Sequence, residues 1–366
     1  MVCNSKKLRK VYFIVIPFLI ILLGFLPTFY LKTNAKGNII EETTVPILTY
    51  HKFCIGDSPD EYTININLFK QQLEYLKENK YQVISVSQLL KCIKNNNFPE
   101  KPIVITIDDG FKSVYTLAYP LLKEYQFPAT LFLYTNFIGN SANQLSWEEI
   151  KEMTDHGMEI GSHTVSHCNL LHLIKNESQI DYLKRIDKEL YLSKKILEEN
   201  TASPIVAFAY PYGIYSQEIK MLAKQAGYQA LLNVNGMNNS IPTIDSYSLN
   251  RQIVPPGFSM KQFDRLLHEK TININSIYPA DGTVTNNQEL KIGAILDDSC
   301  ILPDTLIFRL SGSGPLSYAY VNELKEISFT PVAPKLLQKR TWIAQIVALD
   351  RESGYKRKIS WLFTVK

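Results

Sequence analysis

The sequence predicts an α/β chain in which a barrel of βα repeats is followed by a small all-β domain. Between residues 45 and 268, short apolar runs alternate strictly with segments of helical periodicity. This alternation favours a mostly parallel sheet, and about seven repeats suggest closure into a barrel. Polar residues gather at the predicted C-terminal ends of these strands, the face on which barrel active sites form. Helical periodicity ends near Ser276, where a different architecture begins.

The predicted strands of the barrel lie at 45–51, 81–86, 101–107, 129–135, 158–163, 205–210, 228–234 and 247–254. The first predicted helix lies at 68–78, and the second begins after Ser87, which is predicted to cap it. The others lie at 114–125, 147–155, 178–199, 216–226 and 259–268. Ser146 and Glu149 have the spacing of a capping box at the start of the fourth helix. Ile180 is counted on the apolar face of the long helix.

Residues 275–366 are predicted to form a β-sandwich similar to immunoglobulin-like or fibronectin-like modules. Short alternating runs there are separated by Asp-Gly, Gly-Ser-Gly and Ser-Gly turn signals. Nothing in this region has a catalytic pattern.

The N-terminus predicts a membrane anchor. A basic tail at 1–10 precedes an uncharged apolar run at 11–31, which is long enough to cross a bilayer as a helix. Residues 32–44 are polar and read as a tether. An uncleaved signal-anchor is preferred to a cleaved signal peptide, whose apolar core is usually shorter. Because basic residues stay inside, the rest of the chain is expected to be extracytoplasmic, at the cell membrane or secreted if the anchor is cleaved.

Composition excludes some classes of protein. The net charge of +4 is mild and lies partly in the first ten residues, so no nucleic-acid partner is implied. The five cysteines have no metal-finger or disulfide-framework spacing, and free thiols are expected, the alternative being one bridge among the four that would lie outside the cell.

Two segments carry chemistry. Asp108 and Asp109 end a strand of β-branched residues, and Gly110 lets the chain turn away. His163 and His167 are four residues apart, close enough to hold one ion, and a carboxylate completes the ligand set that Zn²⁺ and related metals prefer. Asp109 is the third ligand in this interpretation, and Asp108 is free to take a proton from a metal-bound water. The structural alternative is an acidic turn beside a chance histidine pair.

Three segments of the chain are Thr-Ile-Asp-Asp-Gly at 106–110, Ser-His-Thr-Val-Ser-His at 162–167 and Ala-Tyr-Pro-Tyr-Gly at 209–213. In this order and spacing they resemble the signatures of the polysaccharide deacetylases, the NodB-homology enzymes of carbohydrate esterase family four. The resemblance covers roughly residues 45–268. It implies a distorted (β/α)7 barrel, placed here at 45–274, a divalent metal that is usually zinc, and hydrolysis of N-acetyl groups from N-acetylglucosamine units or, less often, of O-acetyl groups.

The resemblance also implies roles for single residues. Asp108 would be the base, and Tyr212 would hold the oxyanion through its backbone N–H, with Gly213 beside it on the substrate side. His51 is a candidate for the mouth of the site, or a structural histidine. The implied metal ligands are Asp109, His163 and His167.

Two positions depart from the family pattern. Ala209 stands where many members have an arginine that orients the base, and Arg251 lies in a segment where many have a catalytic histidine, which leaves the general acid open. Arg251 is therefore predicted to orient Asp108, the alternative being a surface arginine.

The Phe-Ala-Tyr-Pro-Tyr-Gly form, with Leu-Thr-Tyr-His51, looks like the subgroup acting on poly-β-1,6-N-acetylglucosamine. The predicted partners are an N-acetylated polysaccharide and the membrane. Alternatives are a peptidoglycan or chitin-oligomer deacetylase, an inactive carbohydrate-binding module, and an adhesion protein acting through its sandwich domain.

Overall fold

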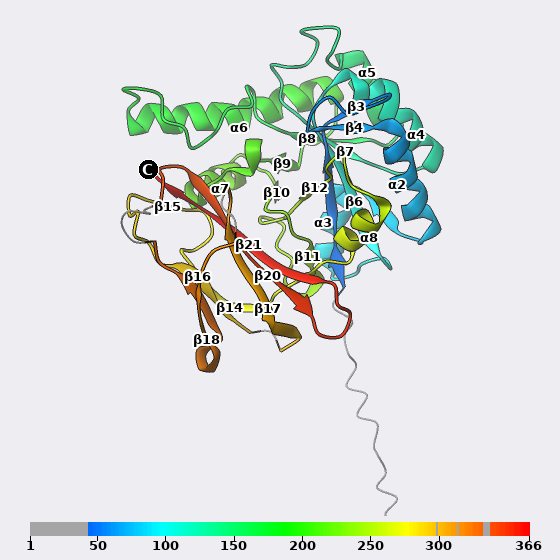
Figure 1. Ribbon diagram of the computed structural model, residues 1–366. Coiled ribbons are helices and arrows are strands. Elements are labelled where there is room, and N and C mark those ends of the chain that lie inside the picture. Colours follow the sequence, from blue (N-terminus) through cyan, green and yellow to red (C-terminus); the bar gives the residue numbers. More distant parts are fainter. Residues whose placement is uncertain (1–42, 298, 313–314, 332–336) are drawn as a thin grey trace, which may run out of the picture. The chain divides into compact units, whose positions relative to one another are not determined.

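The computed structural model describes residues 43–366 apart from 298, 313–314 and 332–336 (Figure 1). The predicted basic tail, the apolar run at 11–31 and almost all of the predicted tether lie outside the described residues. Among the residues that are described, no helix is both long enough and apolar enough to cross a membrane.

A curled parallel sheet forms the first part of the fold. Its strands are β2 (Ile47–Tyr50), β5 (Gln82–Ile84), β6 (Pro102–Asp109), β7 (Thr130–Leu133), β8 (Glu159–Ser162), β9 (Ala207–Ala209), β10 (Ala230–Leu232) and β12 (Gln252–Ile253). The order is β10-β9-β8-β7-β6-β2-β12, with β5 beside β6. Leu249, just before β12, bridges Leu232 of β10, so the two ends of the sheet approach each other. The arrangement is consistent with a distorted barrel.

Helices follow the strands in the predicted alternation. They are α2 (Ile66–Glu78), α3 (Val86–Asn95), α4 (Tyr119–Tyr125), α5 (Trp147–Asp155), α6 (Gln179–Thr201), α7 (Gln217–Gln225) and α8 (Met260–Leu267). A π-helical turn (Val114–Ala118) leads into α4. Short pairs complete this part: β1 (Thr44–Val45) with β11 (Asn239–Ser240), and β3 (Lys52–Cys54) with β4 (Thr63–Asn65).

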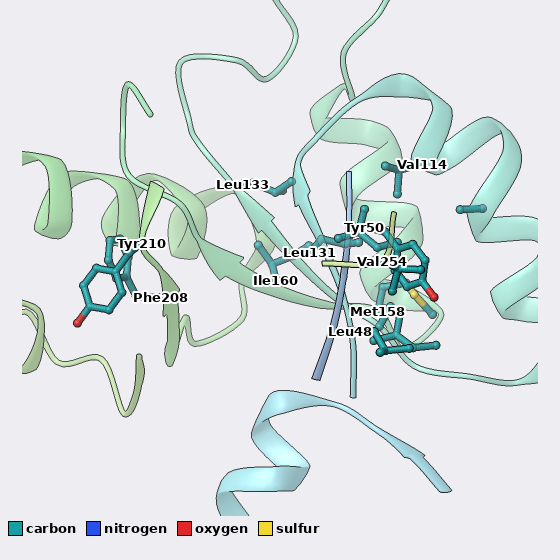
Figure 2. Close-up of a cluster of buried hydrophobic side chains, with 14 of the residues drawn as sticks. Leu48, Tyr50, Val114, Leu131, Leu133, Met158, Ile160, Phe208, Tyr210 and Val254 are labelled. Atoms are coloured by element: carbon teal, nitrogen blue, oxygen red, sulfur yellow. The ribbon is translucent and has the colours of Figure 1, made fainter. Parts of the chain in front are cut away.

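Strand β6 is buried on both faces, as its β-branched sequence predicts. Ile103, Ile105 and Ile107 belong to the larger apolar cluster, which includes residues of the surrounding helices (Figure 2 shows part of it). Val104 belongs to a second cluster with Leu249 and side chains of β2, β7, β9 and β10. Side chains alternate along a strand, so consecutive residues of β6 supply the two clusters. The strand is thereby fixed in position up to its last residues.

Three local predictions are wrong. Ser85 caps α3 in a capping box with Gln88, whereas Ser87 contacts Glu159. The predicted strand 247–254 is reduced to β12, and Arg251 lies just before it. Ile180 is 66% exposed, because the buried stripe of α6 passes through other positions. The capping box of Ser146 and Glu149 at the start of α5 is confirmed.

Two further sheets follow. One contains β13 (Lys270–Thr271), β15 (Thr283–Thr285), β17 (Ile301–Leu310), β20 (Thr341–Asp350) and β21 (Lys356–Val365). The other contains β14 (Ile274–Tyr278), β16 (Ile292–Leu296), β18 (Ala319–Val321) and β19 (Glu326–Phe329). Buried side chains from both sheets form one separate apolar cluster. The immunoglobulin-like topology and the boundary at 274/275 stay predictions.

The C-terminal strands are tied to the parallel sheet, and residues 42–366 form one compact unit. Leu362 of β21 lies in the larger apolar cluster. The Lys358 ammonium, also on β21, lies 2.7 Å from a carboxylate oxygen of Glu269 and donates to the carbonyl of Gly236 at 2.7 Å. The loop that follows β10 is thus held from the C-terminal side.

Candidate active site

The predicted site residues converge on one pocket of about 350 Å³. It lies where β2, β6, β8 and β9 end and is lined by all eight sequence candidates, which are His51, Asp108, Asp109, His163, His167, Tyr212, Gly213 and Arg251. Parallel strands bring their C-terminal ends to one edge of the sheet, and this explains why segments far apart in sequence meet here.

The two aspartates face the same pocket because the backbone changes conformation at Asp109, the last residue of β6. Asp109 has a φ of +74° and Gly110 a φ of +100°. In a continuous strand these neighbours would point to opposite faces. The left-handed conformation is uncommon for a residue other than glycine, and such backbone strain clusters at functional sites. The change of backbone conformation therefore brings the second carboxylate to the first.

His163 is fixed in one tautomer. It directly follows β8 and is buried, and its Nδ1 lies 2.7 Å from the carbonyl oxygen of Ala209. A carbonyl only accepts, so Nδ1 carries the proton and Nε2 presents its lone pair to the pocket. A hydrogen bond of this kind on the far nitrogen is what orients a metal-ligating histidine.

His167 is placed by a strained turn. Its φ is +58°, and its N–H donates to the Thr164 hydroxyl at 2.9 Å. Glu189 of α6 accepts hydrogen bonds from the backbone N–H groups of Val165 and Ser166, both at 2.9 Å. These contacts fix the turn between the two histidines, so the two imidazole rings are held edge to face, with ring centroids 4.7 Å apart.

Asp109, His163 and His167 fit a divalent cation. Their ligand atoms all lie within 4.8 Å of one another. Asp109 Oδ1 is 3.4 Å from His167 Nε2 and 3.9 Å from His163 Nε2. Ligands about 2.0–2.2 Å from a tetrahedral zinc ion lie roughly 3.3–3.6 Å apart. Asp109 Oδ1 is buried and has no hydrogen-bond partner, so it is an acceptor aimed at the place where a cation would bind.

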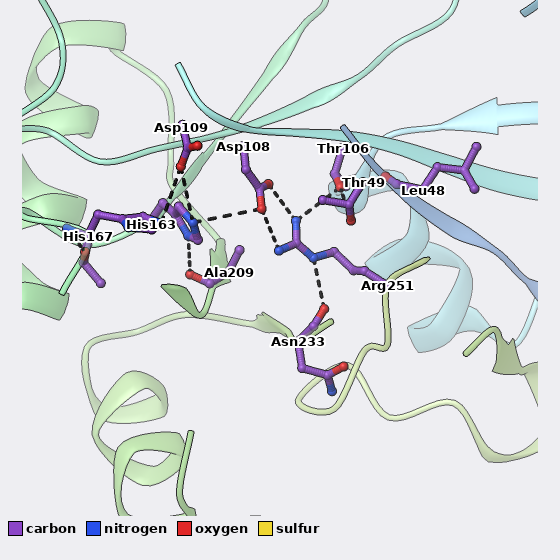
Figure 3. A network of polar contacts seen from close by, with 11 residues as sticks. Leu48, Thr49, Thr106, Asp108, Asp109, His163, His167, Ala209, Asn233 and Arg251 are labelled. Atoms are coloured by element: carbon purple, nitrogen blue, oxygen red, sulfur yellow. Dashed lines mark hydrogen bonds and ion pairs between the residues drawn. The ribbon is translucent and has the colours of Figure 1, made fainter. Parts of the chain in front are cut away.

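Asp108 is clamped by Arg251 (Figure 3). The guanidinium donates to both carboxylate oxygens, NH1 to Oδ1 at 2.7 Å and NH2 to Oδ2 at 2.8 Å. Its other donors reach the Thr106 hydroxyl at 3.2 Å and, through Nε, the Asn233 carbonyl at 3.1 Å. Arg251 is 1% exposed and Asp108 2% exposed, so the pair is excluded from water. The guanidinium therefore holds this carboxylate in one orientation.

The pKa values of the two neighbouring carboxyl groups, Asp108 and Asp109, are shifted in opposite directions. For Asp108, burial acts to raise the pKa, but the charge of Arg251 and its hydrogen bonds outweigh it and lower the pKa to about 2. Burial lowers the pKa of His163 to about 3, so this imidazole is neutral at pH 7 and Arg251 supplies the compensating charge. Burial and the Asp108 charge raise the pKa of Asp109 to about 7. A cation beside Asp109 would relieve this cost.

Three other candidates line the pocket in different ways. Tyr212 has a φ of +60° and an exposed side chain, whose ring lies edge-on to His167 at 4.7 Å. Gly213 is buried, and its N–H donates to the Tyr210 carbonyl. A Cβ at Gly213 would come within 2.2 Å of Val234, so glycine is needed for the close packing of this turn. His51 is half-buried, and burial lowers its pKa.

Comparison with known proteins identifies the family. The model of the polysaccharide deacetylase family matches residues 95–231. YxkH of Bacillus subtilis, which bears a provisional polysaccharide deacetylase name, is 31% identical over 232 residues, which are 63% of this chain and 78% of YxkH. The chain belongs to the polysaccharide deacetylase family.

Two more comparisons are informative. The poly-β-1,6-N-acetyl-D-glucosamine N-deacetylase of Staphylococcus aureus is 30% identical over 171 residues, which are 45% of this chain and 59% of that protein. The structure of the Streptococcus pyogenes deacetylase PplD with acetate aligns with a TM-score of 0.56 and 28% identity, covering 62% of this chain and 99% of PplD. The family's NodB-like fold is therefore shared.

The polysaccharide deacetylase site contains residues that the sequence analysis missed. Thr106 and Asn233 hold the guanidinium of Arg251, and Glu189 holds the histidine turn. Thr106 opens the Thr-Ile-Asp-Asp-Gly segment, and alternation along the strand places it on the same face as Asp108, so it could have been found. Asn233 acts through its backbone carbonyl, which no side-chain pattern reveals. Glu189 lies next to the buried Leu190 of α6, but an acidic residue at the border of a buried helix face usually points to solvent, so its sequence position did not single it out.

Proposed function

We propose that this protein hydrolyses N-acetyl groups of an N-acetylglucosamine-containing polysaccharide outside the cytoplasm, with Zn²⁺ held by Asp109, His163 and His167. The observation that carries the proposal is the juxtaposition of this triad with an ionised, arginine-clamped carboxylate. Asp108 Oδ2 lies 4.0 Å from His163 Nε2, so the base adjoins the ligand cluster without belonging to it.

The residues divide the chemistry between them. A bound divalent ion would lower the pKa of a water molecule and polarise the acetyl carbonyl. Asp108, ionised because of Arg251, accepts the proton that the attacking water loses. Arg251 holds this carboxylate in one rotamer. In many members of the family this role belongs to an arginine at the position that Ala209 occupies here. The backbone N–H of Tyr212 is assigned to the oxyanion, and His51 to the mouth of the pocket.

Poly-β-1,6-N-acetylglucosamine is the substrate we favour. The Staphylococcus aureus relative bears that substrate in its name, and the Phe-Ala-Tyr-Pro-Tyr-Gly segment supports the same subgroup. We also place the protein at the cell membrane with its catalytic part outside. This location rests on the basic tail and the apolar run at 11–31, which lie outside the described residues.

Acetate release tests the proposal. The purified full-length chain is loaded by zinc titration and assayed on poly-β-1,6-N-acetylglucosamine, peptidoglycan and chitin oligomers, with Asp108→Asn as the matched control. Acetate from the first polymer with the wild-type chain only is the expected result. Faster release from peptidoglycan or chitin oligomers would reassign the substrate. Saturable polymer binding with no acetate released by the zinc-loaded chain would make the protein a carbohydrate-binding module.

A further inference from the structure

A second hollow of about 600 Å³ adjoins the catalytic pocket. It lies between α8 with the β12 segment and the strands β17, β20 and β21, and we call it the distal groove. The lining of the distal groove includes Ile253, Phe258, Arg265, Arg309, Tyr355 and Lys356. Ile253 lines both cavities. The two cavities are therefore neighbours that share this side chain.

The distal groove is rich in unused hydrogen-bond donors. Arg265, Arg309 and Lys356 are exposed, and none of them makes a side-chain hydrogen bond or ion pair to another residue in the described part of the chain. The acidic side chain of the lining, Glu269, is already engaged, because Gln252 donates to its carboxylate at 2.9 Å and Lys358 at 2.7 Å. Such a surface suits a ligand rich in acceptor oxygens and disfavours a cationic one.

Apolar surface accompanies these donors. Ile253 is 36% exposed and Leu349 37% exposed. Tyr355 stacks on His268 with ring centroids 4.8 Å apart at 14°, which holds its ring in a fixed plane, and the half-buried Phe258 also lines the groove. Apolar and aromatic surface with a few directed polar groups is the usual composition of a ligand site. Sugar rings, with apolar faces and an equatorial rim of oxygens, match both parts of this lining.

We propose that the distal groove binds N-acetylated sugar units of the same polymer whose acetyl group is removed in the catalytic pocket. The inference rests on the proposed function and adds that the C-terminal strands take part in substrate recognition. Acetamide and hydroxyl oxygens accept from Arg265 and Arg309. A unit that has already lost its acetyl group carries an ammonium when protonated, and the guanidinium groups repel it. The enzyme therefore prefers stretches of polymer that are still acetylated.

Chain-length dependence tests the proposal. Initial rates are measured on a fully acetylated hexasaccharide, a disaccharide and a small acetyl ester that occupies the catalytic pocket alone. The double variant Arg265→Ala/Arg309→Ala should lose about tenfold in kcat/KM on the hexasaccharide, mainly through KM, since each lost hydrogen bond weakens binding modestly. Its rates on the disaccharide and the ester should equal those of the wild type. Lys261→Ala, an exposed cation on α8 outside the groove, is the matched control and should change none of them.

A partly deacetylated hexasaccharide provides the second comparison. The wild type should act on it more slowly than on the acetylated form, and the double variant should narrow that difference. If the double variant lost kcat/KM equally on the ester and on the hexasaccharide, the effect would be a general structural one, and the proposed role of the distal groove would be refuted. A wild type that releases acetate equally well from both chain lengths would also overturn it. Failure of the proposed function looks different: the wild type would then release no acetate from any saccharide.

Discussion

The variant Arg251→Ala tests two roles of this arginine, its contribution to stability and its contribution to turnover. Arg251→Ala leaves the Asp108 carboxylate buried without its partner, which typically costs about 3–5 kcal/mol. For a chain of this size we expect the melting temperature to fall by roughly 10 °C. Burial, the largest influence on Asp108, would then act without the opposing arginine and raise its pKa. Turnover at pH 7 should fall about 10²-fold, because the base is both protonated and misoriented.

The pH profile and a double variant check this reasoning. Acetate release is measured from pH 5 to pH 9 with the metal content determined in parallel. The deficit of Arg251→Ala should shrink as pH rises, because Asp108 regains its ionised form. Arg251→Ala/Asp108→Asn has no buried charge left unpaired and should recover much of the lost stability without recovering activity. Arg251→Lys should not restore turnover, since an ammonium cannot make the two parallel contacts. Near-normal turnover at pH 7 in Arg251→Ala, with metal retained, would refute the positioning role.

Four further outcomes follow from the site. His163→Ala or His167→Ala should lose both metal and nearly all turnover, as measured by metal analysis beside acetate release, because two ligands bind a divalent ion poorly. Asp108→Asn should keep its metal but lose turnover, whereas Asp109→Asn should bind metal weakly; the opposite pattern would exchange the two roles. The raised pKa of Asp109 means that the metal-free protein should lose stability as pH rises from about 4 to about 7, and thermal melts with added zinc should not show that loss. Lys358→Met should lower kcat more than KM by loosening the loop that holds the guanidinium, and equal activity in this variant would place Lys358 outside the positioning network.

The sequence predicts the site far better than the exact course of the chain around it. Asp108, Asp109, His163 and His167 could be placed because strand ends and short-range spacing are local properties. The contact of Arg251 with Asp108 could be anticipated only from the vacancy at Ala209, and the predicted strand around it is too long. Contacts made through backbone carbonyls depend on tertiary packing, so they leave no trace in residue type.

Local competition explains the errors within single elements. Ser85 and Ser87 are both good helix caps, and Gln88 decides between them because it lies three residues after Ser85 and completes the capping box. Ile180 lies in the first turn of α6, where an apolar residue fits the periodicity, but the buried stripe of the helix begins at Tyr182. These distinctions depend on the surroundings of each side chain, which helical periodicity alone does not encode.

The packing of β21 into the larger apolar cluster constrains the order in which the molecule folds. Leu362 fills a position among side chains that come from the parallel sheet and its helices, and β21 pairs with β13 at Lys270 and Thr271. Leu362 must therefore reach side chains that lie much earlier in the chain before this core is complete, and such contacts of high sequence separation form slowly. During synthesis the earlier strands would wait with an exposed apolar face until 356–365 arrive. Chaperone dependence and sensitivity to truncation should accordingly be concentrated at the C-terminal strands, far in sequence from the residues that do the chemistry.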